Sequence, residues 1–175
     1  SIAVGTYAND HHYPGDDWPL APKSCRWGGR WTGTPFCIPF EALVSSEISN
    51  LLAAEKCFSV SHIANGATRL QPLILNIGQA AGLAAALAVR SNHDLHELPV
   101  DSLQQQLIDD PHAPAAVLPI WDWPYWHPHW REAQHRAVRN PDALRQDGSL
   151  ASAQASELSL PAAAAAPSER HGQQI

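Results

Sequence analysis

Residues 50–89 read NLLAAEKCFSVSHIANGATRLQPLILNIGQAAGLAAALAV, and this stretch decides the fold. Its first part holds two short apolar segments, Asn50–Ala54 and Cys57–Val60, which predict two buried strands. A polar loop over residues 61–71 follows, and it ends where Pro72 opens a helix, because a proline in the first helical turn sacrifices no intrahelical hydrogen bond. Polar groups thereby gather at a helix N-terminus, a place that favours an anion or an electron-rich ligand edge.

The predicted helix runs from Pro72 to about Val89 and carries small residues at every fourth position, Gly78, Gly82 and Ala86. A glycine inside a helix costs ~1 kcal/mol relative to alanine, so two of them need a reason. One reason is close approach of a sheet or of a bound ring system to this face. The other is a tight packing face between protein elements and no ligand, and the spacing fits both.

The same helix is apolar, and its GxxxG spacing also occurs where membrane helices pair. Asn76 and Gln79 interrupt the apolar run, and the run is shorter than the ~20 residues that span a bilayer. We therefore expect a buried helix and no membrane partner.

Outside this stretch, β-prone pieces at Ser1–Tyr7 and Thr34–Pro39 predict short strands among turn-forming residues. Apolar residues at helical spacing predict a helix over Val100–Asp109, and a short helix is expected around Trp130–Arg139. After Gly148 large apolar residues are few, which predicts a disordered tail.

Residues 121–130 read WDWPYWHPHW, which is too rich in proline for one long element. Aromatic residues of this kind can anchor a terminal segment onto a folded body. They can also form a platform on which sugars or bases stack.

The net charge is −6, and the 11 Lys and Arg residues are scattered, so nucleic acid is an unexpected partner. Cys25, Cys37 and Cys57 are too far apart for a CxxC motif, and we expect reduced, partly buried thiols in a cytoplasmic protein. Asp10, His11 and His12 could be interpreted as metal ligands. Because no further ligand group stands at helical or hairpin spacing, we expect no metal site.

The ordered motifs of residues 50–89 resemble the C-terminal flavin-contacting segment of FAD-dependent oxidoreductases distantly similar to fumarate reductases and glucose-inhibited division proteins. The shared order is Asn-Leu-Leu, Ser-His, Gly, Arg, Pro and GQAAG, supplied here by residues 50–52, 61–62, 66, 69, 72 and 78–82. Upstream, TPFCIPFEALVS at residues 34–45 is similar to the family's YxIPYRSLLP stretch, and Tyr7–His12 with Pro14-Gly15 resembles its short Asp-x-His segment. The resemblance extends from about Val4 to Val89.

This resemblance implies a part of a Rossmann-like flavin-binding fold in the α/β class, with FAD as cofactor and hydride or electron transfer on a small-molecule substrate. The resemblance, together with the composition of the residues beyond it, predicts four segments: substrate-side strands over 1–49, an FAD-contacting strand–loop–helix over 50–92, a helical and Trp/Pro-rich extension over 93–148, and the tail over 149–175.

The resemblance also implies roles for particular side chains. His62, Arg69 and His12 are the catalytic candidates, with Arg69 beside the flavin or an anionic substrate group and His62 orienting substrate or moving a proton. Structural roles for Arg69 and His62 remain the alternatives. The positions implied to contact the cofactor are Gly66, Arg69, Pro72, Leu73, Ile74, Leu75, Gly78, Gln79 and Gly82.

The sequence departs from the family pattern at two points. Glu55 stands where the family has a glycine close to the cofactor, and the GxGxxG fingerprint that cradles a dinucleotide is absent from these residues. We therefore expect a partner for this chain, an N-terminal FAD-binding half that is part of the same parent chain or a separate polypeptide. The alternative is a non-catalytic remnant or binding module.

Overall fold

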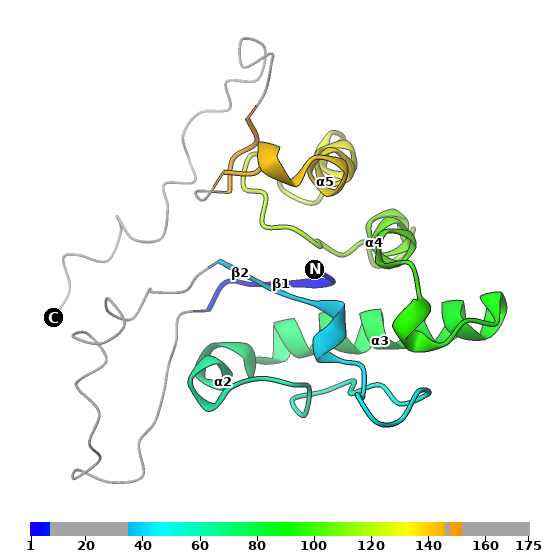
Figure 1. Ribbon diagram of the computed structural model, residues 1–175. Helices are drawn as coiled ribbons and strands as arrows, with labels where there is room; N and C mark the ends of the chain where they lie inside the picture. The colour runs from blue at the N-terminus through cyan, green and yellow to red at the C-terminus, as the bar shows by residue number, and fades with distance from the viewer. Residues whose placement is uncertain (8–34, 146–147, 152–175) are drawn as a thin grey trace, which may run out of the picture.

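The computed structural model describes residues 1–7, 35–145 and 148–151 (Figure 1). It combines helices with a small antiparallel sheet, so the presence of both α and β elements is as expected, whereas the Rossmann-like arrangement stays a prediction. The elements in chain order are β1 (Ala3–Gly5), β2 (Phe36–Ile38), the 3₁₀ turn η1 (Phe40–Ala42), α2 (His62–Thr68), α3 (Gln71–Ser91), η2 (Leu95–Glu97), α4 (Val100–Asp109), α5 (Trp130–Arg139) and η3 (Pro141–Ala143).

The two strands pair in the register Ala3↔Ile38, Val4↔Cys37 and Gly5↔Phe36, which confirms strands in both predicted places. Figure 1 shows this ribbon lying across α3, with α4 packed against α3 and α5 packed against α4. One cluster of buried apolar side chains extends from Ile2 beside β1 to Ala137 on α5. The sheet and the C-terminal helices therefore share a core.

The long helix predicted from Pro72 is confirmed as α3. Its buried side chains follow helical spacing and face the core: Leu73, Ile74, Ile77, Ala80, Ala81, Ala84 and Ala88. The helix ends at Asn92 in the left-handed region (φ 53°), which asparagine tolerates better than most residues. Among the described residues, α3 is the helix long and apolar enough, by length and composition, to cross a membrane; 39% of its most apolar stretch is buried.

The two strands predicted at Asn50–Ala54 and Cys57–Val60 are wrong. Leu52 makes only an isolated bridge with Val44, and residues 55–59 form turns and bends. The physical reason is the partner that these residues meet. The N–H of Ala53 donates to the carbonyl oxygen of Leu43 (2.8 Å), and the N–H of Ser59 donates to that of Ala42 (2.8 Å). Single hydrogen bonds to the turn after η1 thus replace a ladder.

Three further expectations are corrected. The loop predicted over 61–71 contains the helix α2. Cys37 and Cys57 are exposed rather than partly buried, and Cys25 lies outside the described residues. Of the tail predicted from residue 149, the first part is ordered, because Leu150 bridges Leu144 and its N–H donates to a carboxylate oxygen of Asp122 (2.9 Å). Residues 152–175 are outside the described part.

The helix predicted around residues 130–139 is confirmed as α5, and it anchors the extension to the core. Trp130 and Trp123 are buried, which supports the anchoring interpretation of the aromatic segment. Trp123 packs against His127 with ring centroids 4.1 Å apart. Tyr125 and Trp126 are exposed and meet edge to face at 86°, which gives no shared flat surface.

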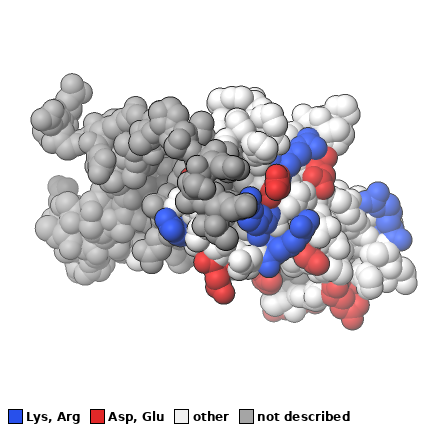
Figure 2. All heavy atoms as spheres, turned by 90° about the horizontal axis from the view of Figure 1, so that it is seen from above, with Lys and Arg blue, Asp and Glu red and all other residues white. Residues whose placement is uncertain are grey.

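Charged residues of both signs are interspersed over the described part of the face shown in Figure 2. That distribution agrees with the scattered Lys and Arg of the sequence.

A Gly5→Ala substitution should destabilise the chain, because a Cβ atom at residue 5 would overlap the ring of Phe36 on the paired strand. Overpacking of this kind costs about 1–3 kcal/mol, to be measured as the free energy of unfolding in denaturant. The double variant Gly5→Ala/Phe36→Leu should recover most of the loss, since the shorter side chain relieves the overlap. Equal losses in the single and double variants would contradict this packing.

Candidate functional site

The helices α2 and α3 meet at a short turn, and of the residues implied in cofactor contact Arg69 lies in this turn while most of the others lie in α3. The Oγ of Ser61 caps α2 by accepting a hydrogen bond from the N–H of Ala64 (3.1 Å). Arg69 is the C-cap of α2, and Leu70 is the N-cap of α3. Gly66 is buried in the last turn of α2, so its backbone packs against the body of the protein.

The catalytic candidates lie at opposite ends of α2. His62 is its exposed first residue, whereas Arg69 is half-buried beyond its last. At a rise of about 1.5 Å per residue their Cα atoms are about 10 Å apart along the helix. Their backbones therefore do not bring them to one centre. His12 lies outside the described residues, and the roles of all three stay predictions.

The backbone N–H groups of Leu73, Ile74 and Leu75 at the start of α3 are not all available to a ligand. The N–H of Ile74 donates to the carbonyl oxygen of Leu70 (3.1 Å). Because Pro72 has no N–H, helical geometry leaves Gln71 and Leu73 as the donors without an intrahelical acceptor. The side chains of Leu73 and Ile74 are in the core, while Pro72 is exposed.

The two glycines of α3 are not held in a tightly packed face, since Gly82 is exposed and Gly78 is half-buried. A Cβ atom at Gly78 would lie 3.5 Å from the carbonyl oxygen of Ala54, an ordinary contact, and one at Gly82 would meet nothing within 4 Å. On the same side Leu75 is 73% exposed and Val89 is 82% exposed. We call the exposed residues Pro72, Leu75, Gly82, Ala85, Ala86 and Val89 the outer face of α3.

Gln79 has a structural contact in this chain. Its Nε2 donates to the carbonyl oxygen of Ala113 (2.6 Å), which follows α4. The Gln79 amide thus fixes the segment after α4 to the side of α3.

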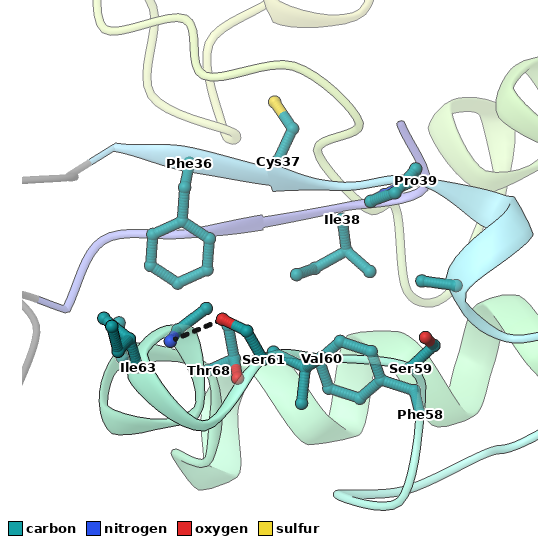
Figure 3. Close-up of a pocket in the computed structure, with 13 residues that line it drawn as sticks. Phe36, Cys37, Ile38, Pro39, Phe58, Ser59, Val60, Ser61, Ile63 and Thr68 are labelled. Atoms are coloured by element: carbon teal, nitrogen blue, oxygen red, sulfur yellow. Dashed lines mark hydrogen bonds between the residues drawn. The ribbon is translucent and has the colours of Figure 1, made fainter. Parts of the chain in front are cut away.

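A cavity of about 490 Å³ lies between β2 and α2 and is the feature that the sequence does not reveal (Figure 3). Figure 3 shows Phe36 and Ile38 pointing from β2 toward α2, and Cys37 pointing to the opposite side of the strand. Large apolar side chains from the strand, from the segment before α2 and from α2 line the cavity: Phe36, Ile38, Phe58, Val60 and Ile63.

One polar atom stands out in this wall. Thr68 is 5% exposed, and its Oγ1 has no hydrogen-bond partner among the described residues. Alternation along a strand could have indicated that Phe36 and Ile38 share one face. The unpartnered hydroxyl of Thr68 depends on tertiary packing and leaves no signal in the sequence.

Removing the Ser61 cap should weaken α2 selectively. A Ser→Ala change at an N-cap costs about 1 kcal/mol, so Ser61→Ala is expected to speed amide hydrogen exchange in α2 about fivefold while exchange in α4 stays unchanged. Ser59→Ala is the matched control, because Ser59 lies outside the capping position. Unchanged exchange in α2 of the Ser61→Ala variant would show that the cap does not stabilise this helix.

Comparison with known protein families identifies a match for this chain. The model of a family described as FAD dependent oxidoreductase matches residues 1–107, which is more than half of the chain. Comparison with curated proteins finds no match, and comparison with solved structures finds none. The matched range contains β1, β2, α2, α3, the cavity and the outer face of α3.

Proposed function

The chain belongs to the FAD dependent oxidoreductase family, whose cofactor is FAD, and we propose that it forms one wall of the flavin site in such an enzyme. The proposal extends to the partner. A nucleotide-binding half, either part of the same parent chain or a separate polypeptide, covers the outer face of α3 and holds the adenosine diphosphate part of FAD. The proposed reaction is hydride or electron transfer on a small-molecule substrate in the cytoplasm.

The observation that carries this proposal is the contrast between the two faces of α3. The inner face is packed in the core, whereas the outer face exposes Leu75, Val89 and the open position at Gly82. Contiguous exposed apolar surface on a folded protein commonly marks an interaction site. A helix with small residues on that side lets a facing sheet or a planar ring approach its backbone closely.

The residues present fit the flavin end of FAD. The N–H groups of Gln71 and Leu73 lack intrahelical acceptors, and the positive end of the dipole of α3 favours negative charge there. Arg69, at the turn that precedes this end, would add a positive charge. These fixed donors would stabilise an anionic ring edge without reorganising. When bound, FAD supplies the hydride or electron transfer chemistry of the family.

This sequence has no loop that would bind the pyrophosphate of FAD, because no GxGxxG motif is present. At the position where the family has a glycine, Glu55 is exposed, and one of its carboxylate oxygens accepts a hydrogen bond from the N–H of Lys56 (2.9 Å). This turn is occupied by a side chain that a cofactor would have to pass. Both features support the proposal that the nucleotide half is supplied from elsewhere.

The test is to express the chain together with its nucleotide-binding half, joined as one longer polypeptide, and to compare it with the chain alone. We expect the longer polypeptide to purify yellow with about one FAD per chain, and the chain alone to bind FAD weakly. A folded but colourless longer polypeptide, with no flavin after addition of FAD, would contradict the proposal. It would favour the second candidate, a non-catalytic remnant or binding module, which Glu55 and the missing fingerprint support.

A further inference from the structure

We propose that the cavity between β2 and α2 binds a neutral, mainly apolar small molecule that carries one hydroxyl or carbonyl group, held by a hydrogen bond to Thr68. The proposal that such a molecule binds depends only on the structure of the cavity. That this molecule belongs to the substrate class of the enzyme rests on the proposed function.

The described lining of the cavity disfavours a charged occupant. Its residues are apolar or carry hydroxyl or thiol groups, and among the described residues that line it none is an acid, a base or a histidine. A carboxylate or phosphate would lose its hydration in this cavity without meeting a counter-charge, which is strongly unfavourable. An uncharged molecule has no such penalty.

The size and shape of the cavity suit a small ring system. Its volume of about 490 Å³ falls in the range of about 300–1,000 Å³ that is usual for small-molecule sites. Phe36 and Phe58 contribute aromatic rings from β2 and from the segment before α2 (Figure 3). Aromatic walls of this kind pack well against the face or edge of another ring.

The polar contact is assigned to Thr68 because its hydroxyl is buried without a partner, unlike the hydroxyls of the two serines that line the cavity. The Oγ of Ser61 is already engaged in capping α2, and Ser59 is exposed. Thr68 is almost fully buried, and its Oγ1 has no partner in the part of the chain that the structure describes. Buried polar groups in native proteins nearly always have a partner, so a ligand atom is the partner that this hydroxyl lacks.

The test compares 2-naphthol with naphthalene, two ring systems of the same shape that differ by one hydroxyl. Binding is measured by fluorescence titration of the 175-residue chain without flavin, so a failure here leaves the flavin proposal untouched. Thr68→Val keeps the shape of the side chain and removes its hydroxyl. We expect the affinity for 2-naphthol to fall about five- to tenfold and the affinity for naphthalene to stay within about twofold. The melting temperature of the unliganded variant should rise, because an unpartnered buried hydroxyl has been removed.

Ala64→Leu and Gln105→Leu serve as the filling variant and its control. Ala64 lines the cavity on α2, whereas Gln105 is an exposed residue on α4 that does not line it. Both ligands should lose at least tenfold in affinity for Ala64→Leu and bind Gln105→Leu like the unchanged chain. The proposal is overturned if the unchanged chain binds neither ligand, if Ala64→Leu binds both normally, or if Thr68→Val weakens both ligands equally or neither.

Discussion

Replacing Gly82 with leucine is expected to stabilise the isolated chain and at the same time to reduce FAD retention by the longer polypeptide about tenfold or more. The stabilisation follows from helix propensity, because leucine is favoured over glycine inside a helix by somewhat less than the ~0.8–1 kcal/mol that separates alanine from glycine, and a Cβ atom at this position meets nothing within 4 Å. The loss of FAD follows from overpacking against the nucleotide-binding half, at about 1–3 kcal/mol. The two measurements are the free energy of unfolding of the isolated chain and the flavin absorbance per purified longer polypeptide.

Gln105→Leu is the matched control, since Gln105 is an exposed residue on α4, away from the outer face of α3. It introduces the same side chain and should leave FAD retention unchanged. If Gly82→Leu also leaves FAD retention unchanged, the outer face of α3 is not the surface that the partner covers. Opposite signs for stability and FAD retention are the specific signature, because a variant that merely misfolds would lose both.

A Gln134→Leu substitution is expected to lower the free energy of unfolding by about 3–4 kcal/mol. Gln134 is 0% exposed. Its Oε1 accepts from the N–H groups of Val117 (3.2 Å) and Leu118 (3.1 Å), and its Nε2 donates to the carbonyl oxygen of Leu118 (2.9 Å). Leucine has a similar volume but leaves these buried backbone groups unpaired.

The measurement is thermal unfolding followed by circular dichroism. For a chain of this size 1 kcal/mol shifts the melting temperature by about 2–4 °C, so a drop of about 10 °C is expected. Gln105→Leu on α4 again provides the comparison, and its effect should stay within about 0.5 kcal/mol. If the melting temperature of Gln134→Leu stays near that of the unchanged chain, the segment around Val117 and Leu118 does not depend on this amide.

The sequence predicts α3, α4 and α5 well because their determinants are local. α3 has a proline in its first turn and apolar residues at helical spacing, so its helical type can be recognised from the local sequence. The same holds for α4, where Leu103 and Leu107 fall on one face. The strands β1 and β2 are found for a similar reason, since β-prone residues stand between turn formers.

The errors occur where a short apolar run has no local determinant of its type. Residues 50–60 have strand-like composition, but the backbone that they meet is a turn after η1, so their hydrogen bonds are isolated. α2 contains Asn65 and Gly66, which are weak helix formers, and only the Ser61 cap indicates a helix start. Tertiary packing decides both cases.

The candidate site divides in the same way. The order of motifs around Arg69 and Pro72 is readable from the sequence, and so is the stripe of Gly78 and Gly82. Which side of α3 that stripe faces is not readable, because it depends on how β1 and α4 cover the other side. The unpartnered hydroxyl of Thr68 is even harder to predict, because it depends on which atoms of the folded chain lie near it, and no hydrogen-bond partner does among the described residues.

The shared core has a consequence for how this protein can be divided. The family match ends at Leu107, inside α4, and both Leu107 and the adjacent Ile108 are fully buried. Their neighbours include Ala115, whose N–H donates to the carbonyl oxygen of Leu107 (2.9 Å), and the α5 residues of the same core. The part of the chain that matches the family, residues 1–107, is therefore shorter than the part that shares one packed core. A chimaera with a relative should exchange the module together with residues up to 151, because a junction at the edge of the match would cut through the packed interior.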